Sequence, residues 1–171
     1  KAIGFPNKRL EDWKFSDFKD IINKNFEKLD VQKSTNNTQQ INLLQEFDHN
    51  YIFLINGNLS SSNFDFEEKN KIKINIYEGD TDYQISKNPL VCLNHALAEG
   101  GYSLEVDNNY KFKKSLVIYN FFTKDINNKI LNSKNRILIN ENSELHVIEY
   151  TINESQFNFI SNVHENIILK K

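Results

Sequence analysis

Apolar side chains recur with two different periods along the chain, and the first period is helical. In residues 16–29 the apolar positions are three or four apart: Phe18, Ile21, Ile22, Phe26 and Leu29. This spacing places them on one face of an α-helix. Ser16 is expected to cap the helix, and Asp17 suits its first turn, because unpaired backbone N–H groups point out of that end. Trp13 and Phe15 directly precede the helix and are predicted to anchor it to the rest of the protein.

After this helix the pattern becomes polar and then strand-like. Residues 32–40 are rich in Asn and Thr, which predicts a linker. A short second helix over residues 40–47 is a further expectation. Residues 51–55 are all apolar and are followed by Asn56-Gly57, a dipeptide typical of tight turns between strands. A β region is therefore predicted to begin after Asn50.

Several later segments show the strand period or form short apolar runs. Residues 72–76 and 102–106 alternate between apolar and polar side chains, which is expected of strands with one face in water. Continuous strand-like runs follow at residues 116–122, 136–139, 145–152, 157–160 and 163–169. One helix interrupts the strands near residues 88–99, with Asn88 as its cap, Pro89 at its first position and Gly100-Gly101 as its stop.

Strands in close succession favour a sandwich, a barrel or a stacked β-helix over a βαβ fold. The period alone does not choose among these three. Residues 102–109 and 136–142 are roughly similar to each other, which favours repeated rungs, as in solenoids. We therefore predict a helical N-terminal region with a polar linker over residues 1–48. A β domain is predicted over residues 49–171, with the helical insertion inside it.

Charge and composition argue against several classes of protein. The formal net charge is −2 and the pI is about 6.1, so nucleic acid and anionic membranes are not expected partners. No segment approaches the roughly 20 apolar residues of a membrane helix, and the N-terminus has no secretory signal pattern. Cys92 is the single cysteine, so no internal disulfide can form. We predict a cytoplasmic protein.

The two ends of the chain suggest part of a longer protein. The sequence contains no methionine, and residues 166–171 stop within a strand-like run that has no turn signal. We expect that the chain is a fragment.

Cys92 and His95 form the most suggestive chemical pair. They are three residues apart on a predicted helix and therefore share a face, a spacing that two metal ligands can use. However, structural zinc takes four ligands, iron–sulfur clusters need several thiolates, and no second pair lies nearby. A nucleophile–base role is weaker still, because the helix supplies no oxyanion hole. We expect a buried thiol beside a packed or half-exposed histidine.

No other constellation predicts catalysis. Gly100-Gly101 leads into a strand, whereas a phosphate-binding loop leads into a helix. The remaining histidines are scattered: His49, His146 and His164. The acidic pairs all fall in polar segments that are expected to be solvated: Glu11-Asp12, Glu67-Glu68 and Asp80/Asp82. We predict no catalytic, cofactor-binding or metal-binding residue, and no enzyme activity.

Residues 4–18, GFPNKRLEDWKFSDF, resemble the N-terminal signature of the SufD family. That signature has a proline, a basic pair, Glu-Asp-Trp, Lys or Arg, an aromatic residue, Ser or Thr, and Asp. Three further stretches follow in the family's order, namely residues 53–57, residues 88–101, and residues 135–139 with 143–149. The resemblance thus spans nearly the whole chain. The sister subunit SufB shares the β architecture but differs in its N-terminal region, so SufD is the closer match.

The resemblance implies a mainly β protein, with a small helical N-terminal domain that leads into the opening rungs of a right-handed parallel β-helix. It implies a non-enzymatic scaffold that pairs with SufB and the ATPase SufC to assemble an iron–sulfur cluster for apo-proteins. The family's SufC-binding region, its main SufB contact and its cluster-assembly residues lie downstream of the part represented here, so no site residue is carried over and no cofactor is expected in this segment. Family members commonly have a small apolar residue at the position of Cys92, so this cysteine is expected to be structural.

Two other classes of function stay open. One is a β-helix or sandwich that binds or cleaves polysaccharide with exposed aromatic and acidic side chains on one sheet face. The other is an interaction module of a larger assembly that does not depend on SUF subunits.

Overall fold

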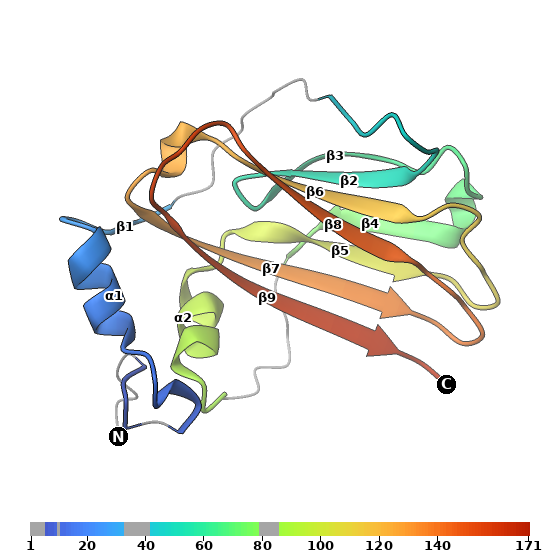
Figure 1. Ribbon diagram of the computed structural model, residues 1–171. Helices are drawn as coiled ribbons and strands as arrows, with labels where there is room; N and C mark the ends of the chain where they lie inside the picture. The colour runs from blue at the N-terminus through green and yellow to red at the C-terminus, as the bar shows by residue number, and fades with distance from the viewer. Residues whose placement is uncertain (1–5, 10, 33–41, 79–85) are drawn as a thin grey trace.

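The computed structural model describes residues 6–9, 11–32, 42–78 and 86–171. These residues form two α-helices and nine strands in two mixed sheets (Figure 1). Sheet A contains β1 (Asp30–Val31), β4 (Ile72–Ile76), β5 (Gly100–Val106), β7 (Lys129–Ile139) and β9 (Ile160–Leu169). Sheet B contains β2 (Asn50–Ile55), β3 (Asn58–Asn63), β6 (Leu116–Phe122) and β8 (Val147–Asn153). The helices are α1 (Phe18–Asn25) and α2 (Pro89–Leu97), with short 3₁₀ turns at Glu11–Trp13, Lys69–Lys71 and Lys124–Ile126.

Each sheet combines a parallel stack with an antiparallel partner. In sheet A, β5, β7 and β9 run parallel, β4 pairs antiparallel with β5, and β1 pairs parallel with β7. In sheet B, β2, β6 and β8 run parallel, and β3 pairs antiparallel with β2. The two sheets face each other, and α2 packs on the other face of sheet A against β7 and β9 (Figure 1).

The predicted right-handed parallel β-helix is wrong. The described residues form an α/β arrangement of two mixed sheets that do not close into a solenoid. One reason is the turn at Asn56 and Gly57, whose φ angles of 49° and 78° send the chain straight back as a hairpin. Alternation along a strand shows which side chains share a face, but it does not show which neighbour the strand pairs with. The similar residues 102–109 and 136–142 do lie side by side, because β5 and β7 pair in parallel.

The main core lies between the sheets. Its fully buried members come from three strands, β5 of sheet A and β2 and β6 of sheet B, namely Ile52, Leu54, Tyr102, Leu104, Val106, Leu116 and Ile118. Each buried aliphatic side chain of this size contributes about 1.5–3 kcal/mol. The outer face of sheet B is also covered, because Leu43 and Leu44 pack on Phe53 and Tyr119. Burial on both faces explains why β2 and β6 are nearly continuous apolar runs.

The N-terminal helix begins one residue later than predicted and ends earlier. Asp17, and not Ser16, is the cap, and its carboxylate accepts hydrogen bonds from the backbone N–H groups of Lys19 (3.0 Å) and Asp20 (3.2 Å). Trp13 contacts Phe18 with ring centroids 6.1 Å apart, and Phe18 is buried. The predicted anchoring role of Phe15 is wrong, because that side chain is 92% exposed.

The predicted short helix over residues 40–47 is wrong where it can be judged, because residues 42–47 are not helical. Residues 40 and 41, and the predicted linker after Gln32, lie outside the described residues. The division at residues 48 and 49 stays a prediction. No helix among the described residues is long and apolar enough to cross a membrane.

The strands predicted at residues 51–55, 72–76, 102–106 and 116–122 are confirmed. The run at 163–169 lies within β9, and of the run predicted at 157–160 only Ile160 belongs to a strand. The segment predicted at 136–139 is only the end of β7, which starts at Lys129. Its first half was missed because buried polar residues interrupt the apolar pattern there: Asn132, Ser133, Lys134 and Asn135.

Helix α2 is confirmed together with its cap, because the Asn88 side chain accepts a hydrogen bond from the backbone N–H of Leu90 at 2.9 Å. Its buried residue is Asn94, which donates to the carbonyls of Ser133 (2.9 Å) and Asn162 (2.6 Å). Gly100-Gly101 does not stop the helix but opens β5. Gly101 has a φ of 127°, and a Cβ there would lie 1.7 Å from the Lys134 carbonyl oxygen, so only glycine fits.

Candidate functional site

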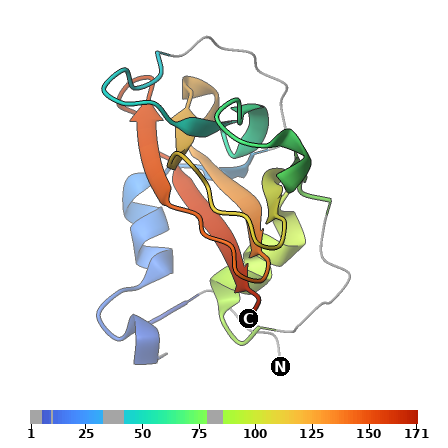
Figure 2. The ribbon, with the colours of Figure 1, turned by 90° about the vertical axis from the view of Figure 1, so that its right-hand side faces the viewer.

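Strands β8 and β9 form an open side of the molecule. Within the described residues each has one neighbour, β6 for β8 and β7 for β9. Figure 2 shows β9, β7 and β5 following one another from left to right. Along the row Leu104, Ile137 and Ile167, which share the inward face of sheet A, the exposed fractions are 0%, 2% and 60%. We call the exposed inward-facing side chains of β8 and β9 the open-edge surface: Val147, Val163, Ile167 and Leu169.

A cleft of about 480 Å³ lies beside this surface, between β6 and β8 of sheet B and β7 and β9 of sheet A. Glu149 and Glu165 both line it. The Glu165 carboxylate accepts hydrogen bonds from the Tyr102 hydroxyl (3.2 Å) and from Asn135 Nδ2 (3.0 Å). Burial and the neighbouring charge of Glu165 raise the pKa of Tyr102 and that of Glu149. The cleft therefore holds two carboxylates whose negative charges repel each other.

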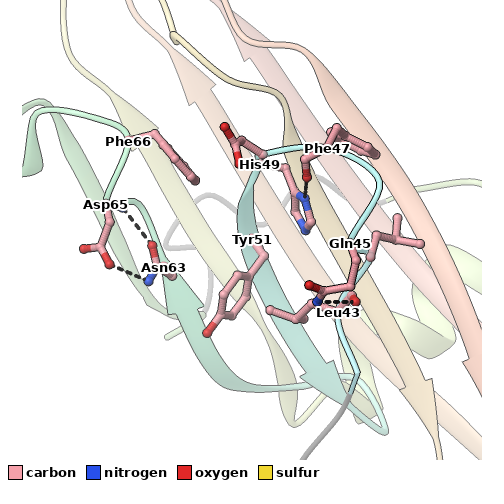
Figure 3. A pocket seen from close by; sticks show the side chains of 10 residues that line it. Leu43, Gln45, Phe47, His49, Tyr51, Asn63, Asp65 and Phe66 are labelled. Atoms are coloured by element: carbon pink, nitrogen blue, oxygen red, sulfur yellow. Dashed lines mark hydrogen bonds between the residues drawn. The ribbon is translucent and has the colours of Figure 1, made fainter.

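A second pocket, of about 300 Å³, lies between the segment that carries Leu43 and the end of β3 (Figure 3). Its half-exposed rings are Phe47 (41% exposed) and Phe66 (40% exposed). Figure 3 shows Tyr51 between the Asn63–Asp65 pair and Leu43. The Asn63 side chain donates to Asp65 Oδ2 at 2.7 Å, and this bond, together with Lys69, lowers the pKa of Asp65.

His49 lines the same pocket and is part of a hydrogen-bond chain. Its Nδ1 lies 2.9 Å from the Phe47 carbonyl and therefore carries the proton, since a carbonyl can only accept. Its Nε2 then accepts from the Tyr119 hydroxyl at 2.6 Å, and the hydroxyl oxygen accepts from the Leu44 N–H at 3.1 Å. These bonds fix the segment from Leu44 to His49 over the outer face of sheet B.

Glu67 does not lie in a solvated segment, contrary to the prediction. It is 7% exposed and accepts hydrogen bonds from Asn50 Nδ2 (2.8 Å), the Tyr110 hydroxyl (2.8 Å) and the backbone N–H groups of Lys113 and Lys114 (both 3.0 Å). Burial alone would raise the pKa of Glu67, but these bonds outweigh it and the pKa is lowered. Its role is to hold two loops together.

Cys92 and His95 lie on one helix but contact different groups. Cys92 is half-buried, and its thiol donates to the Ser86 carbonyl at 3.1 Å. His95 Nδ1 lies 2.7 Å from Lys134 Nζ, and the His95 ring lies 5.1 Å from the His164 ring. In the described part of the chain, no three His, Cys, Asp or Glu residues are grouped so as to hold a metal ion. The expectation that this pair binds no metal stays a prediction.

The other residues weighed in the sequence are scattered. His146 is exposed just before β8, Glu11 lies in the first 3₁₀ turn, and Asp80 and Asp82 lie outside the described residues. Sequence reasoning missed Glu149 and Glu165, because each acidic residue stands alone in its strand. The available signal was their place at inward positions of alternating strands, which brings them together only after the pairing is known.

No protein-family model matches the chain, and no curated protein matches it.

Proposed function

We propose that this chain belongs to a SufD-like, non-catalytic scaffold subunit that pairs in the cytoplasm with SufB and the ATPase SufC to assemble iron–sulfur clusters. The ordered resemblance described above supports the assignment to this family. The β-helix that the resemblance implied is not the fold of the described residues, so the proposal does not rest on architecture. No residue of this chain is assigned to the cluster, which is the cargo of the complex.

The open-edge surface is the structural observation that carries the scaffold role. A strand with one neighbour offers a row of backbone N–H and C=O groups to another chain. Here two such edges lie together, and four apolar side chains beside them are 40–68% exposed. An added chain that covers them gains backbone hydrogen bonds and buries apolar area. The buried core of a protein interface is usually apolar in this way. This surface is suited to a protein partner.

The test is affinity purification of the tagged, full-length gene product from its own cells, with mass spectrometry of the proteins that co-purify. We expect SufB and SufC. The matched variants are Ile167→Lys, on the open-edge surface, and Ile76→Lys, on edge strand β4 of the same sheet. Their side chains are 60% and 61% exposed, so the two changes are equally tolerable in the free protein. Ile167→Lys should lower the recovery of SufB and Ile76→Lys should not.

Recovery of neither SUF subunit with the unaltered protein would refute the family assignment. Equal recovery with both variants would refute the role of the open-edge surface and leave the family assignment standing.

A second candidate function is polysaccharide binding, because the pocket in Figure 3 combines half-exposed aromatic rings with Asp65 and Asn63. Sugars stack their apolar faces on such rings and hydrogen-bond to such polar groups. Retention on immobilised glycans that is lost in Phe66→Ala and kept in Phe15→Ala would favour it. Phe15 is a suitable control because it is 92% exposed and does not line this pocket. No retention of the unaltered chain would remove this candidate.

A further inference from the structure

The cleft between the sheets is a built site whose polar walls come from both sheets. Tyr102, Asn135 and Glu165 are paired neighbours on β5, β7 and β9, so they form one polar row on the inward face of sheet A. Glu149 lines the cleft from β8 of the opposite sheet, and Ile118 of β6 is its neighbour in that sheet. Tyr102 is 0% exposed and Asn135 is 6% exposed, so the groups that hold Glu165 are fixed.

One buried acceptor in this site has no donor. Asn135 Nδ2 donates to Glu165 Oε2, and this orientation is required because a carboxylate can only accept. The other end of the amide, Asn135 Oδ1, is buried and makes no hydrogen bond. A buried oxygen without a donor destabilises the fold. The described residues therefore leave the amide of Asn135 with one acceptor unused.

The site also lacks positive charge. No lysine, arginine or histidine is among the described residues that line the cleft. The raised pKa of Glu149 reflects burial and the charge of Glu165, with no cation to offset them. The described lining of the cleft therefore combines two carboxylates, Glu149 and Glu165, with no basic side chain.

We propose that this cleft binds a primary alkylammonium group. An ammonium has three N–H donors and no acceptor, and its positive charge complements the carboxylates of Glu149 and Glu165. Phe122 and Ile118 are buried apolar walls of the same cleft, and they provide the surface for the alkyl chain. The ligand is a free alkylamine or a lysine side chain of another polypeptide. This inference does not depend on the SUF assignment.

A hard metal ion fits the cleft less well. Calcium takes six to eight oxygen ligands and magnesium demands a near-ideal octahedron, whereas this site offers two carboxylates and one amide oxygen. A volume of about 480 Å³ also exceeds the needs of a single ion. The alternative is that Glu149 and Glu165 are inward-pointing charges that only keep other strands off the two edges.

The test is a titration of the ¹⁵N-labelled chain, followed by NMR, with three probes at matched ionic strength: n-butylammonium chloride, the peptide Gly-Lys-Gly and magnesium chloride. We expect saturable shifts of the Asn135 side-chain amide and of the backbone amides of Glu149 and Glu165 with n-butylammonium. Saturation with Gly-Lys-Gly as well assigns the ligand to a lysine side chain. Saturation with n-butylammonium alone assigns it to a free amine.

Two variants make the test specific. Glu149→Gln should weaken n-butylammonium binding about tenfold or more, since it removes one charge-assisted hydrogen bond. Glu141→Gln removes the same charge from an exposed turn and should leave the affinity unchanged. Well-dispersed spectra of both variants establish that they are folded. Non-saturable shifts, equal effects of the two variants, or an equal saturable response to magnesium would each overturn the proposal.

Discussion

The two sides of the inter-sheet space share rows of inward-facing side chains but differ in how far these side chains are buried. On the closed side, rows such as Ile52 with Ile118 are covered by both sheets and are 0–2% exposed. On the open side the row of Ile118 continues to Glu149, and the row of Ile137 continues to Ile167. Both of these end residues are exposed. The row of Leu104, Ile137 and Ile167 stays apolar along its whole length, whereas its burial ends at Ile137. Burial in this molecule is therefore set by whether a row has a neighbouring strand, and not by the strand sequence alone.

The polar residues follow the same division. Glu67, on the closed side, is surrounded by donors that favour its charged form. Glu149, on the open side, has only burial and another carboxylate as the causes of its shifted pKa. One carboxylate stabilises the fold, and the other leaves a charge without a counterpart. The open side is therefore the better candidate for a binding site.

The largest expected effect is a difference in the free energy of unfolding between substitutions of Leu104 and Ile167, two aliphatic residues of one row. Leu104→Ala should lower the free energy of unfolding by about 2–5 kcal/mol, because the fully buried side chain leaves a cavity. Ile167→Ala should change it by about 0.5 kcal/mol, because the side chain is 60% exposed. Urea unfolding of both variants measures this difference. Equal losses would contradict the division into a closed and an open side.

The next effect concerns Glu67. Glu67→Gln should cost about 1–3 kcal/mol at neutral pH, because an amide nitrogen replaces an oxygen that accepts hydrogen bonds. The folded-state pKa of Glu67 is lowered, so its stabilising contribution is full above the ordinary pKa of about 4.3 and is lost as the pH falls through the lowered folded-state value. Urea unfolding of the two proteins at a series of pH values should therefore converge in acid. A constant difference from neutral to acid pH would exclude ionised Glu67 as the cause.

The sequence predicted the strands well where one principle acts alone. The alternation of apolar and polar residues located β4 and most of β5. The residue types alone identified the Asn56-Gly57 turn and the Asn88 cap. It failed where tertiary contacts decide. Several buried polar side chains of β7 bond to the neighbouring α2 or β9, as in the bond from Asn162 Nδ2 to Asn132 Oδ1 at 2.8 Å, and no local pattern encodes such partners.

The candidate site was missed for a related reason. Glu149 and Glu165 come together only through two separate parallel pairings, β6 with β8 and β7 with β9. Glu67 was interpreted as solvated because its neighbours in sequence are polar. However, four of the five hydrogen bonds to its carboxylate come from residues more than 40 positions away. A long-range donor set leaves no trace in local composition.

A smaller effect is expected inside the cleft wall. Tyr102→Phe removes the hydroxyl that donates to Glu165 and should cost about 0.5–1.5 kcal/mol, with the ring packing unchanged. The control is Tyr150→Phe, because Tyr150 is 41% exposed on the outer face of sheet B. Thermal unfolding of the two variants compares them directly. A larger loss in Tyr150→Phe would place the more important hydroxyl outside the cleft.

The smallest effect has the opposite sign. Glu149→Gln should raise the free energy of unfolding at neutral pH by a few tenths of a kcal/mol, because it removes repulsion from Glu165 at a half-exposed position. The folded-state pKa of Glu149 is raised, so its ionisation destabilises the fold as the pH rises from the ordinary glutamate pKa through the raised value. The gain in Glu149→Gln should therefore vanish at acid pH, where both side chains are neutral. Urea unfolding at neutral and acid pH measures it. A loss of stability at neutral pH would mean that Glu149 already has a cationic partner within the chain, and the cleft would then have no unmet charge to offer a ligand.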